Sequence, residues 1–270
     1  MRQKKHWLLT LYGYLMLLLL LLPLVLVVVT SFGSQAAITF PIKGFTLKWY
    51  ANILSQPDFV TGFKTSFAVA VTASFLAIVV GTPAVYALTR RGIPHANWFQ
   101  TVFLSPTLIP EIVIGFALFQ SLVIGIKLPL MPVLITGHFL LSVPYVIRML
   151  TARLLLFDQT IEEASWLSGA SKIKTFFRVV IPNISGTLLA IFIMCFINSF
   201  NNIPITLFLN GPSLTMLPTA ILNYLQNNYD PTVSAVSVIL MLLTGLMMWL
   251  MERMNGLTRV NEHLNQKGQK

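Results

Sequence analysis

The sequence predicts an all-α membrane protein with six transmembrane helices. Hydrophobic residues make up 56% of its 270 residues and charged residues only 10%, whereas soluble domains carry about 25% charged residues. The mean hydropathy of +0.78 agrees with that composition. Apolar stretches long enough to cross the hydrocarbon must be helical, because lipid offers no partners to exposed backbone groups. We expect such spans at about 8–29, 66–88, 100–124, 130–152, 184–204 and 232–251, within a single transmembrane domain that covers residues 1–270.

The first apolar stretch has some features of a signal peptide. Arg2, Lys4 and Lys5 precede it, and Ser34-Gln35-Ala36 has the small residues of a cleavage site. The run 7–29, however, exceeds the roughly 7–15 residues of a signal-peptide core and reaches the ~20 residues that a span needs. We therefore interpret it as an uncleaved first span.

The distribution of basic residues predicts the orientation of the spans. If the chain crosses six times, fourteen of its 18 Lys and Arg residues lie on the side of the N-terminus. Basic residues accumulate on the cytoplasmic side of membrane proteins, so we expect both termini in the cytoplasm and residues 205–231 in an outer loop. The net charge of +10 then reflects membrane topology rather than a nucleic-acid-binding face. The four bases expected outside are Lys43, Lys48, Lys64 and Lys127.

Signatures of catalysis, nucleotide binding and metal binding are absent from the sequence. The single cysteine, Cys195, excludes an internal disulfide and a cysteine-based metal cluster. The four histidines are scattered, and we expect His138 to be a hydrogen-bonded residue at a helix interface rather than a ligand. No glycine-rich phosphate-binding loop with its lysine occurs, so the chain is not expected to bind ATP by that mechanism.

Residues 153–183 form the longest predicted cytoplasmic loop, and they contain the stretch EEASWLSGASKIKTFFRVVIP. Asp158 or Thr160 is placed to cap a helix whose first turn carries acids, which the helix dipole favours. Gly169 permits a bend into a second, amphipathic helix, and Pro182 is expected to end that helix before the fifth span. A surface-lying connector without a partner would explain the same pattern.

This stretch resembles the EAA loop of type I binding-protein-dependent ABC importer permeases. The family pattern is Glu-Ala-Ala, two free positions, Asp-Gly-Ala, eight free positions and Ile-x-Leu-Pro. Its spacing is kept here, although Ser165, Ser168, Val179 and Ile181 replace the family residues. The resemblance implies a coupling helix that fits a groove on an ATP-binding subunit. The residues that would couple this chain to the ATPase are Glu163, Ala164, Ser165, Ser168, Gly169, Ala170 and Pro182.

Other stretches resemble the polyamine (spermidine/putrescine) branch of the same family, namely PTLIPEIVIG and SFNNIPITLFLNGPSLTMLPTAIL. The resemblance implies an inner-membrane subunit that forms the solute path with a second homologous permease and receives solute from a periplasmic solute-binding protein. It also implies a dimer of ATP-binding subunits that binds ATP and Mg²⁺, leaving this chain without cofactor, metal or catalytic residue. The resemblance leaves open whether the two permeases are identical, and whether the solute is a polyamine, another organic amine or a small anion.

Glu111 is the only acid well inside a predicted span, so it is a candidate for the translocation path or its gate. Ionisable groups within a membrane are costly and usually face a cavity or a partner. Pro106 and Pro110 precede it and predict a kink in the third helix. A purely structural pair with a neighbouring helix would also explain this acid.

Asn198, Asn201 and Asn202 are spaced to share one face of the fifth span, before Pro204 interrupts it. They are candidates for the same path or gate, although asparagines also hold helices together in lipid. Permeases of the polyamine branch tend to carry an Asp near the position of Asn201, and its absence weakens the case for a cationic solute.

An ATP-independent secondary carrier or channel is the alternative function. A secondary carrier needs residues that couple transport to an ion, and one acid within the spans gives it little support. An integral membrane enzyme has less support still, because no catalytic constellation is present in the sequence.

Overall fold

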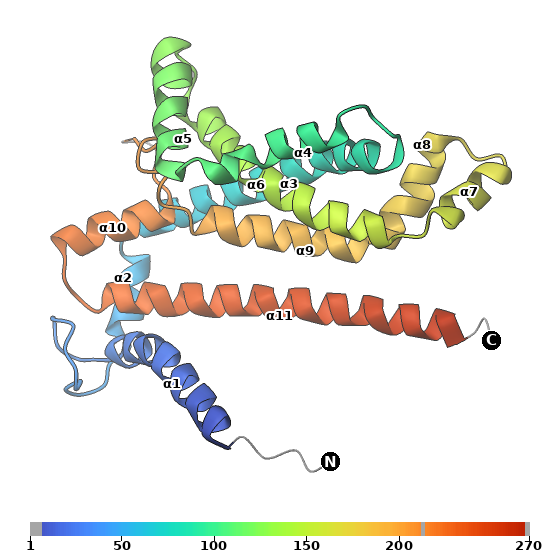
Figure 1. The fold of residues 1–270 in the computed structure, drawn as a ribbon. Coiled ribbons are helices and arrows are strands. Elements are labelled where there is room, and N and C mark those ends of the chain that lie inside the picture. The colour runs from blue at the N-terminus through green and yellow to red at the C-terminus, as the bar shows by residue number, and fades with distance from the viewer. Residues whose placement is uncertain (1–6, 212–213, 268–270) are drawn as a thin grey trace. The chain divides into compact units, whose positions relative to one another are not determined.

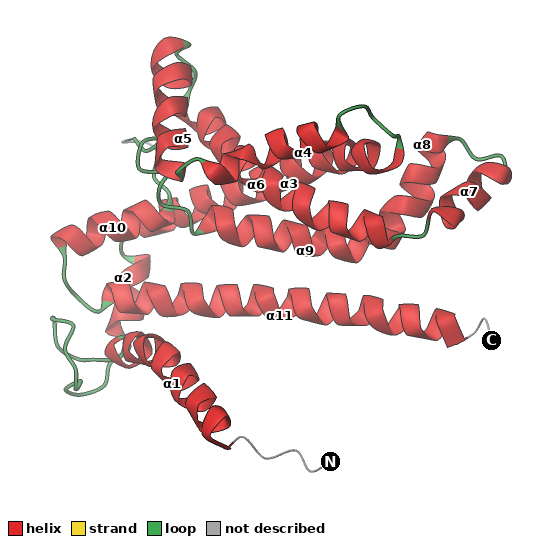
Figure 2. Ribbon diagram, viewed as in Figure 1, coloured by secondary structure: helices red, strands yellow, loops and turns green. Residues whose placement is uncertain are grey.

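The structure is a computed structural model that describes residues 7–211 and 214–267 (Figure 1). These residues form helices joined by loops, and within them extended pairing is confined to an isolated bridge between Gly211 and Leu214 (Figure 2). This confirms the predicted all-α fold. Arg2, Lys4, Lys5 and Lys270, which contribute to the predicted orientation, lie outside the described residues.

Five helical segments of the described chain are long and apolar enough to cross a membrane, and a sixth span is available if a bent pair of helices counts as one. This agrees with the six spans expected from the sequence. The five segments are Leu9–Thr30 of α1 (Trp7–Thr30), α3 (Pro57–Arg90), α6 (Leu130–Leu156), the continuous run Lys172–Phe200, and Thr232–Arg253 of α11 (Thr232–Lys267).

The third predicted span is broken rather than kinked. Its two halves meet at an angle of 94°, a sharper bend than the kink predicted from Pro106 and Pro110 within the span 100–124. The break falls at Ile109, which is extended, and at Pro110, which lacks the N–H that a continuous helix would use. The first half comprises α4 (Ala96–Leu104) and the 3₁₀ helix η1 (Ser105–Leu108), and the second comprises α5 (Glu111–Leu118) and the π-helix η2 (Phe119–Gly125).

The described chain divides into two compact units. The first contains residues up to Val60 together with Ala220–Leu243, and it includes α1, α2 (Lys48–Leu54) and parts of α10 (Leu217–Asn227) and α11. Polar contacts tie its helices together: Thr30 Oγ1 donates to Ser234 Oγ over 3.2 Å. Asn52 Nδ2 donates to Thr232 Oγ1 over 2.9 Å.

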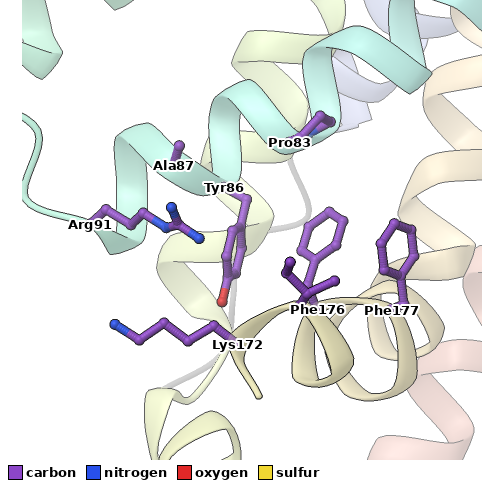
Figure 3. A pocket seen from close by; sticks show the side chains of 8 residues that line it. Pro83, Tyr86, Ala87, Arg91, Lys172, Phe176 and Phe177 are labelled. Atoms are coloured by element: carbon purple, nitrogen blue, oxygen red, sulfur yellow. The ribbon is translucent and has the colours of Figure 1, made fainter.

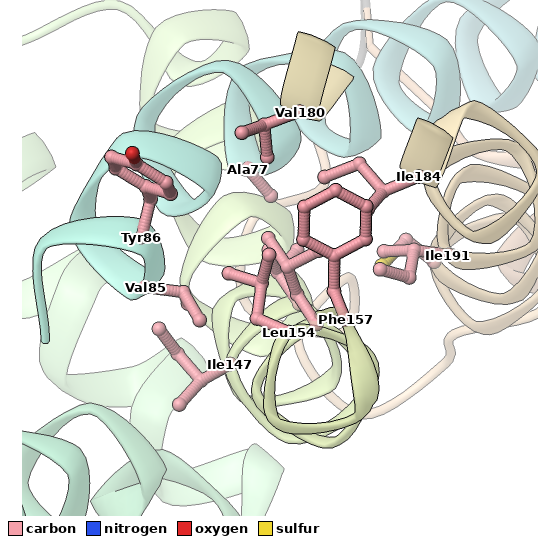
Figure 4. Close-up of a cluster of buried hydrophobic side chains, with 12 residues drawn as sticks. Ala77, Val85, Tyr86, Ile147, Leu154, Phe157, Val180, Ile184 and Ile191 are labelled. Carbon is pink, nitrogen blue, oxygen red and sulfur yellow. The ribbon is translucent and has the colours of Figure 1, made fainter. Parts of the chain in front are cut away.

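The second unit contains Thr61–Thr219 and Thr244–Lys270, and its centre is the packing of α6 against α9 (Ile181–Phe200). One apolar core joins these two helices to α3, with Val85, Ile147 and Ile191 inaccessible or nearly so to solvent (Figure 4). Phe157 and Val180, which flank the loop between α6 and α9, are buried in this core beside Val85 and Tyr86 of α3.

A second apolar core includes the beginning of the predicted outer loop 205–231. Ile205 and Leu209 are fully buried among residues of α3, α5 and α6. The approach to α5 is close, because a Cβ added to Gly115 would lie 3.0 Å from the Ile205 Cα and carbonyl oxygen.

Candidate functional site

The loop between α6 and α9 begins with a capped helix, α7 (Gln159–Leu167). Asp158 is the cap: its carboxylate accepts a hydrogen bond from the Thr160 backbone N–H over 2.9 Å, and this bond lowers the pKa of Asp158. The sequence left Asp158 and Thr160 as alternatives, and the geometry selects Asp158.

The predicted bend at Gly169 is present. Gly169 has a φ of +84°, in the left-handed region that favours glycine. The backbone N–H groups of Gly169 and Ala170 donate to the carbonyls of Trp166 and Ser165, over 2.9 and 3.1 Å, and close the end of α7. Within the described residues, no atom lies within 4 Å of a Cβ added to Gly169, so the turn faces open space.

The second helix of the loop does not end at Pro182, contrary to the sequence-based expectation. The short helix α8 (Lys172–Thr175) continues through the π-helix η3 (Phe176–Val180) into α9, and the whole run qualifies as a span. Pro182 lies in the first turn of α9. The wider π-helical turn before it tolerates a residue that has no N–H to donate. The loop is therefore joined to the fifth span by a continuous helical run.

Glu162 anchors the start of α7, which the sequence did not reveal. It is only 1% exposed, and its Oε1 lies 2.9 Å from Arg90 Nε at the end of α3. The Tyr86 hydroxyl donates to the other oxygen, Oε2, over 2.5 Å. Arg90 also donates from a terminal nitrogen to the carbonyl of Phe157 over 2.7 Å. In the sequence, Arg90 ends an apolar run and Glu162 follows a helix cap. Neither local pattern indicates that the two side chains form an ion pair.

The structure brings most of the predicted coupling residues together on the exposed side of α7 and its turn. Leu167, at the end of α7, is 90% exposed, which is unusual for a large apolar side chain in a packed chain. Ser165 is half-buried because its Oγ lies 2.9 Å from Thr175 Oγ1. Pro182 is set apart, in α9. The exposed members are Glu163, Ala164, Ser168 and Gly169, and Ala170 is half-buried.

Glu111 and Asn202 form a polar pair near the break in the third span. Glu111 is the first residue of α5, and its Oε2 accepts a hydrogen bond from Asn202 Nδ2 over 2.6 Å. The Asn202 Oδ1 in turn accepts from the backbone N–H of Ile205 over 3.2 Å. Asn202 is buried and Glu111 is half-buried.

The three asparagines do not share one helix face as predicted. α9 ends at Phe200, so Asn201 caps it and is exposed, while Asn202 lies beyond the helix and is buried. Helical spacing cannot apply past the end of the helix. Asn198, still within α9, donates from Nδ2 to the Tyr145 hydroxyl over 3.2 Å.

His138 is a hydrogen-bonded residue at a helix interface, as the sequence indicated. It is fully buried in α6, and its Nδ1 lies 2.8 Å from Ser199 Oγ of α9. Together with the pair of Asn198 and Tyr145, this contact holds α6 and α9 in register.

Residues 84–260 match the family model described as the inner membrane component of binding-protein-dependent transport systems. The chain belongs to this family. The permease is 26% identical over 226 residues to the putrescine transport system permease protein PotI of Escherichia coli (strain K12), which covers 81% of this chain and 80% of PotI. It is 27% identical over 226 residues to the spermidine/putrescine transport system permease protein PotC of the same organism, covering 82% of this chain and 83% of PotC.

A solved structure agrees with the fold of the permease. It resembles, with a TM-score of 0.68 and 16% identity, a chain of a bacterial ABC transporter involved in the import of the acidic polysaccharide alginate, over 92% of this chain and 96% of that chain. The protein is thus a permease subunit of an ABC importer of the type I family and a multi-pass protein of the inner membrane, and it is similar to polyamine permeases.

Proposed function

We propose that this permease imports a small organic solute, such as a polyamine, together with a second homologous permease. A periplasmic solute-binding protein delivers the solute, and a dimer of ATP-binding subunits binds ATP and Mg²⁺ and drives the cycle. This chain contributes the path and no catalytic residue or cofactor. The family's dependence on a binding protein and the named solutes of PotI and PotC support the proposal. Ligand binding by the cognate binding protein tests the choice of solute.

We further propose that both termini are cytoplasmic and that α7 with its Gly169 turn docks on the ATP-binding subunit. The observation that carries the docking proposal is an exposed surface of small residues at one end of α7, which is held at its other end by a buried ion pair. Leu167 is 90% exposed at this surface, whereas Glu162 is buried against Arg90. A push on the turn would reach α3 through that ion pair and would reach α9 through the continuous helix from α8.

Substitution of Gly169 by Asn tests the docking. Asparagine tolerates a positive φ better than other residues do, and open space surrounds the position, so the permease should still fold. The added side chain should prevent docking, and we expect co-purification of the ATP-binding subunit to fall at least tenfold.

Gly92 offers a matched control for this experiment. It also has a positive φ, of +57°, and no described atom lies within 4 Å of its added Cβ, but it lies outside the motif. Gly92→Asn should therefore assemble as the wild type does. Normal assembly and solute-stimulated ATPase activity of Gly169→Asn would contradict the docking proposal.

Glu111 and the three asparagines are proposed to line the translocation path or its gate. Glu111→Gln keeps the size of the side chain and an oxygen that can accept from Asn202, but it removes the charge. We expect uptake of solute to fall strongly while the amount and thermal stability of the transporter stay close to wild type. The exposed acid Glu252 in α11 provides the control, Glu252→Gln. Full uptake by Glu111→Gln would leave the pair of Glu111 and Asn202 as a structural contact only.

Asn198 and Asn201 are proposed for the same path.

A further inference from the structure

A cavity of about 330 Å³ lies between the last turns of α3 and the start of α8, outside the surface proposed to dock on the ATPase (Figure 3). Pro83 and Tyr86 line it from α3, and Phe176 and Phe177 line it from η3. Both α3 and η3 also contribute residues to the first buried apolar cluster.

The two ends of this cavity differ in polarity. Figure 3 shows the cationic groups of Arg91 and Lys172 on one side and the rings of Phe176 and Phe177 on the other. No acidic side chain is among the residues that line it in the described part of the chain. Glu162 lies nearby, but its charge is already matched by Arg90. The cavity therefore combines an excess of positive charge with an apolar wall.

The cavity also lies where two spans end. Arg91 directly follows the candidate span of α3, and Lys172 is the first residue of the span that continues into α9. Cationic residues at such positions lie at the level of lipid headgroups. Ile173 and Phe177, one helical turn apart, are 70% and 63% exposed, as expected for side chains that contact acyl chains.

We propose that this cavity binds a phospholipid with an anionic headgroup. Its phosphate is held by charge-assisted contacts with Arg91 and Lys172, and an acyl chain lies along Phe177. Tyr86 lines the same cavity, and its hydroxyl donates a hydrogen bond to Glu162. The bound lipid therefore packs beside the contact that holds α7 to α3. The lipid would thereby hold the loop against α3.

The test uses the assembled transporter in phosphatidylcholine nanodiscs into which phosphatidylglycerol is titrated. Native mass spectrometry measures the phosphatidylglycerol that stays bound. The double variant Arg91→Gln/Lys172→Gln should weaken retention about fivefold for each cation and roughly 25-fold together. Lys174→Gln/Arg178→Gln removes the same charge from exposed residues that do not line the cavity, and it should weaken retention less than about twofold.

Equal retention by the first double variant, or an equal loss in the control variant, would overturn the proposal. Inorganic phosphate that displaces the lipid at millimolar concentration would show a site for a free anion instead. A photo-crosslinking residue in place of Phe177 gives a second measurement that does not depend on the charge variants. Crosslinks to phosphatidylglycerol are expected, and crosslinks to the ATP-binding subunit alone would assign the cavity to that protein and overturn the lipid.

Discussion

The buried ion pair between Arg90 and Glu162 makes a quantitative prediction for the loop. Glu162→Gln removes one charge and leaves the Arg90 guanidinium buried. Loss of one partner from a buried pair costs about 3–5 kcal/mol. Two contacts limit the loss here, since glutamine can still accept from Tyr86 and Arg90 keeps the Phe157 carbonyl at 2.7 Å. We therefore expect a loss near the lower limit, about 3 kcal/mol.

Two further substitutions set the scale for this value. Tyr86→Phe removes a single hydrogen bond to a charged group, which costs about 1.5–3 kcal/mol. Glu163→Gln changes the adjacent acid, which is exposed, and should alter stability by less than about 0.5 kcal/mol. If Glu163 couples to the ATPase as proposed, this variant should nevertheless lose coupling. Glu162→Gln would then reduce stability, whereas Glu163→Gln would reduce coupling with little change in stability.

The assay is the free energy of unfolding of the purified permease in mixed micelles, measured by titration with a denaturing detergent. Limited proteolysis reports on the loop itself, and cleavage after Leu167 should accelerate in Glu162→Gln well before global unfolding. If Glu162→Gln unfolds within about 0.5 kcal/mol of wild type and resists protease equally, the ion pair does not anchor α7 and the reasoning fails.

The remaining predictions concern the helix cap and two glycines. The hydrogen bond from Thr160 lowers the pKa of Asp158, so the cap should stabilise α7 fully above the unfolded pKa of about 4 and lose its effect as the pH falls through the lower folded pKa. Hydrogen exchange of the Thr160 amide should show this pH dependence. Asp158→Asn should keep the cap but abolish the pH dependence. Gly115→Ala should destabilise the permease by about 1–3 kcal/mol, because its Cβ would meet the backbone of Ile205. Gly245 lies in α11, and no described atom lies within 4 Å of its added Cβ, so Gly245→Ala should instead stabilise the permease by about 0.5–1 kcal/mol. If the two variants change the thermal stability equally, the close approach at Gly115 is contradicted.

The sequence predicted the features of this permease that depend on local chemistry. Apolar runs predicted the spans because lipid permits little else. The cap could be narrowed to Asp158 or Thr160 and the bend placed at Gly169, because caps and bends depend on residues close in sequence. Pro106 and Pro110 indicated a disturbed third span but not its angle of 94°, which depends on how α5 packs against residues around Ile205. The wrong expectation at Pro182 has a similar origin, since a proline ends a helix or is absorbed by a π-turn according to its neighbours.

Contacts between distant segments could not be predicted in this way. Tyr86 and Glu162 are 76 residues apart, and Glu111 and Asn202 are 91 apart. Each acid has an unremarkable local sequence, and its partner follows only from the arrangement of the helices. The sequence could place Glu111 in a span and Glu162 in a first turn, but it could not say which groups they would meet.

The two adjacent acids of α7 point in different directions, as the coupling role proposed for this helix requires. A coupling element needs a firm hold on its own permease and a free surface for its partner. Successive residues of a helix point about 100° apart, so Glu162 can turn inward to Arg90 while Glu163 stays exposed. Removing Glu162 from this pair should cost about 3 kcal/mol, because the Arg90 guanidinium would be left buried without its partner. The two glutamates are therefore not interchangeable. Removal of Glu162 should loosen α7 from α3, whereas removal of Glu163 should weaken binding to the ATP-binding subunit if α7 docks there as proposed.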